Sequence, residues 1–238
     1  MNSKTLRLAT GFFAAASLWI SSLSALGDII VYSNATVRLD KYYAPGIAQF
    51  GDEIILSGGA GQHMTSFTFE YTGIGLSGNE TVTLRFYKND GAVVLSGSIP
   101  ALKPNTKFYD SGAFPINNTQ SDGNTLRFDL PLNDANLIIP NNSYDFTWTV
   151  QFGGIDSASE TAGLDLYSPP NVGNNYADYW EQNPISLDWE LRSGPVGTPN
   201  MSFGATMTAV PEPSPLQVGL LAGAIWLGWS IYRRKATP

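Results

Sequence analysis

The sequence predicts an all-β fold, an antiparallel β-sandwich, for the central part of this 238-residue chain. Hydrophobic and polar residues alternate there with a period of two, which is typical of strands with one buried and one solvated face. No segment of this part shows a helical period. The chain also contains 24 glycines and 15 prolines, which favours a turn-rich β protein. We expect a jelly-roll-like strand order, with an immunoglobulin-like sandwich as the alternative.

About ten strands are expected, and the clearest is 144–152, in which large apolar residues occupy every second position. Turn signals such as Asn89-Asp90-Gly91 and Ser121-Asp122-Gly123 separate the alternating segments. The other strands expected from alternation are 67–72, 81–86, 126–130, 187–192 and 203–207, with shorter candidates at 29–33, 53–57, 107–114 and 162–167.

The N-terminus has the three parts of a secretory signal peptide. Lys4 and Arg7 supply the positive region, and an apolar run follows over 8–23. Ala25 and Gly27 are small residues at the −3 and −1 positions of a cleavage site. We therefore expect 1–27 to be removed, with an uncleaved anchor helix as the alternative.

The C-terminus carries a second apolar run, 216–232, which contains no charged residue. Seventeen helical residues span about 25 Å, which is at the short end of what crosses a bilayer core. Basic residues after such a run stay in the cytoplasm, and Arg233, Arg234 and Lys235 follow at once. The pattern predicts a transmembrane helix over 216–232, with the folded domain outside the membrane. A buried soluble helix is the alternative.

Pro211, Glu212 and Pro213 precede this run. This motif, the apolar segment and the basic cluster 233–235, in that order, resemble the tripartite PEP-CTERM sorting signal of Gram-negative bacteria. The resemblance covers 210–238. It implies an exosortase-like membrane transpeptidase as partner, removal of the tail, and delivery to the cell surface or to exopolysaccharide in a biofilm. A permanent anchor behind a proline-rich linker is the alternative.

The remaining part, 28–209, is expected to form one exported domain. Segments 84–91 and 108–112 resemble parts of uncharacterised exported β-sandwich domains that precede PEP-CTERM tails, which supports the fold and implies no activity. This part holds eight basic and 19 acidic residues, so that its net charge is −11. Such a charge argues against a nucleic-acid partner, which needs a basic surface.

The residue inventory excludes several kinds of chemistry. The chain has no cysteine, hence no disulfide and no cysteine nucleophile, and its single histidine cannot form a zinc centre. That histidine, His63, lies in a glycine-rich segment, where we expect it to be exposed and not catalytic. We expect no cofactor, with calcium at Asn89–Gly91 or at 156–160 as the alternative, since loops rich in Asp and Asn suit this ion.

One segment suggests a binding surface. Tyr176, Tyr179 and Trp180 lie among amide and carboxylate side chains in 171–184, which shows no strand-like alternation. Exposed rings flanked by such groups suit sugar rings, so these three residues are candidate glycan contacts. The alternative is a loop that packs its own aromatic residues onto the sandwich, and Tyr42-Tyr43 is a weaker case of the same kind.

These observations favour a non-enzymatic exported surface or extracellular-matrix protein. The alternative is a lectin-like glycan-binding module. An enzyme acting on polysaccharide is a third hypothesis, for which Glu181 is the most suggestive acid. It would need two facing carboxylates roughly 5–10 Å apart.

Overall fold

The computed structural model describes residues 27–96, 99–116, 123–193, 202–211 and 229. The chain divides into a compact unit, Asp28–Val210, and a second unit made of the two ends, Met1–Gly27 and Pro211–Pro238. The predicted signal peptide lies outside the described residues apart from Gly27, and so does the predicted sorting tail apart from Val210, Pro211 and Trp229. The fold described below is that of Asp28–Val210.

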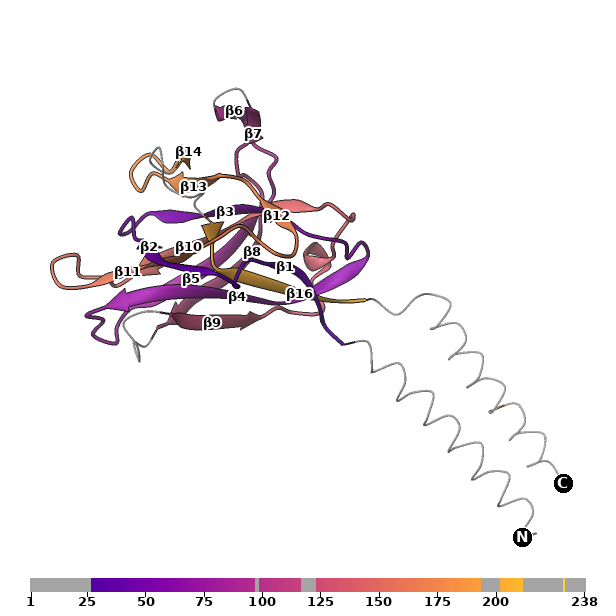
Figure 1. Ribbon diagram of the computed structural model, residues 1–238, viewed down its shortest axis with the longest axis horizontal. Helices are drawn as coiled ribbons and strands as arrows, with labels where there is room; N and C mark the ends of the chain where they lie inside the picture. The colour runs from indigo at the N-terminus through magenta and orange to yellow at the C-terminus, as the bar shows by residue number, and fades with distance from the viewer. Residues whose placement is uncertain (1–26, 97–98, 117–122, 194–201, 212–228, 230–238) are drawn as a thin grey trace, which may run out of the picture. The chain divides into compact units, whose positions relative to one another are not determined.

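Two seven-stranded sheets and a separate two-stranded hairpin make up this unit (Figure 1). Sheet A consists of β1 (Ile29–Ser33), β2 (Arg38–Tyr43), β4 (Gln62–Ile74), β9 (Asn124–Asp129), β11 (Thr161–Tyr167), β15 (Ser202–Phe203) and β16 (Ala205–Pro211). Sheet B consists of β3 (Gln49–Ile55), β5 (Thr81–Tyr87), β8 (Lys107–Pro115), β10 (Asp145–Gly153), β12 (Asn174–Asn175), β13 (Asp178–Gln182) and β14 (Trp189–Ser193). The hairpin is β6 (Val93–Ser96) with β7 (Ile99–Leu102).

The order of sheet B is β14-β13-β3-β10-β5-β8, with β12 paired to β3. Its neighbouring strands pair antiparallel, which confirms the predicted antiparallel all-β class. Between Asp28 and Val210 the described residues include no α-helix, and the 3-10 turn η1 (Ala135–Leu137) follows the loop after β9.

The core lies between the two sheets and is rich in aromatic residues. Trp148 of β10 packs on Phe67 of β4 with ring centroids 4.9 Å apart, and Phe50 of β3 packs on Phe203 of β15 at 5.6 Å. All four side chains are fully buried. Truncation of one such ring to alanine typically costs about 3–5 kcal/mol, so these contacts across the sheets stabilise the sandwich-like packing.

Alternation located most strands correctly, as in β5, where Val82, Leu84 and Phe86 are all buried. The expectation of a loop over 171–184 was wrong, because Asn174–Asn175 and Asp178–Gln182 form β12 and β13 on the edge of β3. These strands lack visible alternation because both faces of β13 are covered, as described below.

Within the described residues, no helix is long and apolar enough to cross a membrane.

The segment predicted to do so, 216–232, lies outside them except for Trp229.

Candidate functional site

The outer face of sheet B carries a row of paired residues that crosses five strands. Trp180 pairs with Gly51, Gly51 with Thr149, Thr149 with Arg85, and Arg85 with Asp110. Their neighbours along the strands, among them Phe50, Trp148 and Leu84, point into the core. Because successive side chains of a strand alternate between faces, the row lies on the face turned away from sheet A.

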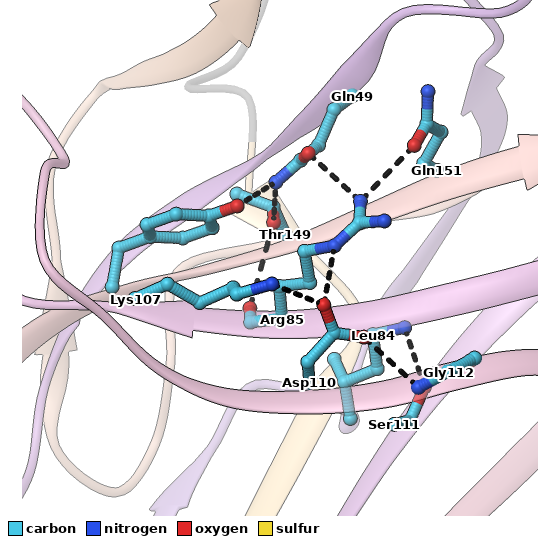
Figure 2. A network of polar contacts seen from close by, with 10 residues as sticks. Gln49, Leu84, Arg85, Lys107, Asp110, Ser111, Gly112, Thr149 and Gln151 are labelled. Atoms are coloured by element: carbon cyan, nitrogen blue, oxygen red, sulfur yellow. Dashed lines mark hydrogen bonds and ion pairs between the residues drawn. The ribbon is translucent and has the colours of Figure 1, made fainter.

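Arg85 is the centre of a polar network on this face (Figure 2). Its Nη1 donates hydrogen bonds to Gln49 Oε1 at 2.9 Å and to Gln151 Oε1 at 3.0 Å. Its Nε donates to Asp110 Oδ2 at 3.1 Å. The guanidinium is thus held by strands β3, β10 and β8 at once, while its side chain remains 20% exposed.

Further bonds position the groups around Arg85. Gln49 Nε2 donates to Thr149 Oγ1 at 2.6 Å and to the Tyr87 hydroxyl at 3.0 Å. Lys107 donates to the same Asp110 oxygen that accepts from Arg85. Burial alone would raise the pKa of Asp110, but the bonds from Lys107, the Gly112 amide and Arg85 outweigh it and lower the pKa. The carboxylate is therefore ionised at neutral pH and balances a positive charge.

The β13–β14 hairpin covers part of this face. Trp180 and Trp189 belong to its outer side, yet they are only 1% and 8% exposed. Trp189 meets Tyr87 of β5 edge to face, with ring centroids 5.4 Å apart. Gly51 allows the backbones of β3 and β10 to approach closely, because a Cβ there would lie 1.9 Å from the Trp148 carbonyl oxygen of β10.

Glu53 lies on the same face, opposite Thr147 of β10, and is 9% exposed. Burial first, and then the neighbouring Asp145 and Asp178, raise its pKa to about 7, although the Trp180 indole lowers it. Glu53 thus exchanges a proton near neutral pH at the margin of the network.

Guanidinium, amide, hydroxyl and carboxylate groups are fixed together here beside two aromatic rings. Such groups donate to and accept from hydroxyls, and a network already bonded into place loses little entropy on binding. The face therefore offers donors and acceptors to a hydroxyl-rich ligand, with the one negative charge of Asp110 held between the positive charges of Arg85 and Lys107.

The structure separates the three rings proposed as glycan contacts. Tyr176 is 41% exposed, but Tyr179 is 6% and Trp180 1% exposed, so Tyr179 and Trp180 are packed away as in the alternative to a glycan site. Tyr179 packs against Tyr43 and Phe203 on the inner side of β13, and Trp180 lies on its outer side. Of the three candidates, only Tyr176 has the exposed ring that stacking on a sugar requires.

Glu181, the acid considered for an enzyme, and Tyr43 of the Tyr42-Tyr43 pair are bonded to each other. Tyr42 is 41% exposed, whereas Tyr43 is partly buried and donates to Glu181 Oε2 at 2.5 Å. Burial first, and then this bond, raise the pKa of Tyr43 far above its usual value. Arg192 Nη2 lies 3.7 Å from Glu181 Oε1. Glu181 therefore bridges a tyrosine and an arginine at the sheet edge.

His63 is not exposed, contrary to expectation. It lies in β4 at 5% exposure, with Nδ1 2.8 Å from the Met64 carbonyl oxygen and Nε2 3.0 Å from that of Asp134. The ring joins β4 to the turn that leads into η1. Its position fits a structural role, because both ring nitrogens face backbone carbonyls.

The loops considered for calcium use their carboxylates internally. Asp90 accepts from the Thr106 amide and hydroxyl at 2.9 and 2.7 Å. Asp156 accepts from the Ala158 amide at 3.1 Å, and Glu160 accepts from the Asp156 amide at 2.8 Å. Across the part of the chain that the structure describes, no group of three or more His, Asp or Glu side chains is arranged to hold a metal ion.

Sequence reasoning missed the network around Arg85. The outward positions of Arg85 and Gln151 are visible in the alternation, but their convergence with Gln49 depends on pairing between distant strands. Of the sorting-signal residues, Pro211 is the last residue of β16. Glu212, Pro213, Arg233, Arg234 and Lys235 lie outside the described residues.

Comparison of the chain with models of protein families, with curated proteins and with solved structures found no match.

Proposed function

We propose that this protein is a non-enzymatic exported surface or extracellular-matrix protein, sorted by an exosortase-like transpeptidase. The observation that carries the proposal is the order of the C-terminal parts: Pro211-Glu212-Pro213, the uncharged run 216–232 and the basic cluster 233–235. The signal peptide, the jelly-roll-like strand order and the membrane helix over 216–232 belong to the same proposal.

The end of the fold supports this assignment. Strand β16 ends at Pro211, so the motif begins where the sheet stops. Prolines at 211, 213 and 215 lack the amide donors that a continuing strand needs, and they favour a stiff, extended chain. Such a composition suits a segment that a processing enzyme has to reach.

The test is a peptide map of the C-terminus of the protein isolated from the surface fraction of its native host. Loss of all peptides beyond the Pro-Glu-Pro motif is expected. A variant with Pro211, Glu212 and Pro213 changed to alanine should keep its tail and stay in the membrane fraction. An intact peptide across Tyr232-Arg233 in the surface fraction of the unchanged protein would contradict the proposal.

Glycan binding is the second candidate function, and the network around Arg85 favours it. Arg85 and Asp110 keep side chains that are 20% and 30% exposed while several strands fix their positions. A unit of net charge −11 repels polyanions. The ligand class is therefore a neutral polysaccharide of the extracellular material, bound on the outer face of sheet B and not by the rings of Tyr179 and Trp180.

Binding of the purified protein to the extracellular polysaccharide of its host, with and without calcium, tests this candidate. Gln151→Ala and Arg85→Ala should weaken binding at least about tenfold, since loss of a hydrogen bond to a charged group costs about 1.5–3 kcal/mol. Arg127→Ala, which removes an exposed arginine of sheet A, is the matched control. Equal binding by all variants would exclude this face, and loss in Tyr176→Ala alone would return the site to the predicted segment. Release of sugar fragments would indicate an enzyme.

A further inference from the structure

The β6–β7 hairpin carries an exposed apolar face outside the sandwich. Val93 pairs with Leu102 and Leu95 with Pro100, so these four side chains share one side of the two-stranded sheet. Val93, Leu95 and Leu102 are 61%, 71% and 43% exposed, and Pro100 is exposed as well. Figure 1 shows the hairpin projecting beyond both sheets. These apolar side chains are therefore not part of the core between the sheets.

The charge of this segment differs from that of the rest of the unit. Residues 91–106 contain Lys103 but no carboxylate, whereas the whole of 28–209 has a net charge of −11. Asp90, which precedes them, accepts from the Thr106 amide and hydroxyl. Lys103 belongs to the base of the hairpin, because its amide donates to the Ala92 carbonyl at 3.1 Å and its carbonyl accepts from the Gly91 amide at 3.0 Å. The apolar face of the hairpin is thus followed, toward the sandwich, by the single lysine of this segment.

The dimensions fit the interfacial zone of a bilayer. Leu95 is opposite Pro100, so Lys103 lies three residues nearer the sandwich, a rise of about 10 Å at about 3.4 Å per residue. Interfacial segments bury their apolar side chains to a depth of about 5–10 Å, with basic residues at the headgroups. Greater depth is excluded, because the outer edges of a two-stranded sheet leave backbone groups unpaired in hydrocarbon.

We propose that the β6–β7 hairpin inserts the side chains of Val93, Leu95, Pro100 and Leu102 into the surface of a lipid bilayer that contains anionic headgroups, with Lys103 at the level of those headgroups. A second copy of the chain fits this apolar face less well than a bilayer does. Four side chains of this size offer at most about 400 Å² of apolar surface, estimated from their transfer energies. A stable protein interface needs about 800 Å² from each partner. A bilayer has no such requirement, since each side chain partitions separately.

The absence of cysteine allows a direct test with the full-length chain. Leu95→Cys is labelled with the polarity-sensitive dye NBD and combined with vesicles of phosphatidylcholine, with and without phosphatidylglycerol. The control is the same label at Asp129→Cys on β9, whose side chain is 81% exposed. Because the label reports its own depth, membrane attachment elsewhere in the chain does not produce the signal.

With phosphatidylglycerol present, NBD at position 95 should shift its emission to shorter wavelengths and be quenched by spin-labelled lipid, whereas NBD at 129 should do neither. Lys103→Glu should weaken the response, and so should salt, since the Debye length falls from about 10 Å at 0.1 M to about 3 Å at 1 M. Val93→Ser combined with Leu102→Ser should abolish the shift, with an unchanged near-ultraviolet circular dichroism spectrum as the check on folding.

Three results would overturn the proposal. The first is an unchanged spectrum at position 95 with vesicles of either composition. The second is an equal response without phosphatidylglycerol, which would remove the role of Lys103. The third is a shift without vesicles that grows with protein concentration, which would assign the apolar face to a second copy of the chain.

Discussion

Tyr87 and Trp189 are in contact although three strands separate β5 from β14 in the order of sheet B. In a flat sheet the two strands would lie about 19 Å apart, at about 4.8 Å for each step, yet the ring centroids are 5.4 Å apart. The outermost strands therefore curl over the outer face. This curl buries Trp180 and Trp189 and partly covers the network around Arg85.

The Tyr87–Trp189 contact should stabilise the curled hairpin measurably. In a double-mutant cycle with Tyr87→Ala and Trp189→Ala, we expect a coupling free energy of about 0.5–1.5 kcal/mol, as for other aromatic pairs. Denaturant unfolding measures it. Tyr87→Phe keeps the ring but loses the hydroxyl that accepts from Gln49, so it should retain most of the coupling. A coupling of zero would mean that the contact does not hold the hairpin.

Gly51 should be needed for the close approach of β3 and β10 beside Trp180. An alanine Cβ at this position would meet the Trp148 carbonyl oxygen and the Thr149 Cα of β10. Gly51→Ala should therefore lower the free energy of unfolding by about 1–3 kcal/mol or more and expose Trp180, which a red shift of tryptophan fluorescence would show. Gly46→Asn is the control, because the Gly46 Cβ position is open and asparagine tolerates its φ of +74°. Equal stability of both variants would show that this close approach does not require a glycine.

Glu53 should make the protein less stable as the pH rises from about 4.5 to about 7. Its pKa is about 7 in the folded state against an ordinary value of 4.5, so the folded state binds the proton more tightly. Stability is then full below about pH 4.5, falls as the pH rises to about 7, and levels off above it. The contribution is roughly 3 kcal/mol, at about 1.4 kcal/mol per pH unit.

Unfolding measured across this pH range in Glu53→Gln should lack that part of the decline, and the variant should be the more stable protein at pH 8. The control is Glu190→Gln, which removes a partly exposed carboxylate of β14. Parallel profiles for Glu53→Gln and the unchanged protein would show that Glu53 is ionised in the folded state throughout.

The ion pair of Arg38 and Asp165 should be costly to break. Arg38 Nη2 lies 3.2 Å from Asp165 Oδ2, and Asp165 is fully buried. Burial raises the pKa of Asp165, while the bonds from Thr72 and Arg38 lower it. Arg38→Met leaves a buried carboxylate without this cation, so a loss of about 3–5 kcal/mol is expected at neutral pH. The loss should shrink in acid as Asp165 takes up a proton.

Arg127→Met is the comparison for this pair, because Arg127 and Asp129 are 58% and 81% exposed. Exposed pairs contribute about 0–1 kcal/mol, and thermal or denaturant unfolding distinguishes the two variants. A similar small loss in both would show that water compensates Asp165 when Arg38 is absent.

The sequence by itself determined the all-β class and most strand positions, because a period of two in hydrophobicity is a local property that can be read without knowing which strands pair. Residues 81–87 and 145–153 show it plainly, with every second side chain in the core. The tripartite tail is also a local pattern, and it supplies the proposed sorting function without help from the fold.

Only the tertiary structure decided which polar and aromatic residues meet. Gln49, Arg85 and Gln151 converge because β3, β10 and β5 pair in one particular register, and pairing between distant strands leaves no mark in any single segment. For the same reason Trp180 looked like an exposed ring in the sequence. It is buried because the outermost strands curl over the outer face of sheet B, and that curl exists only once the sheet has formed.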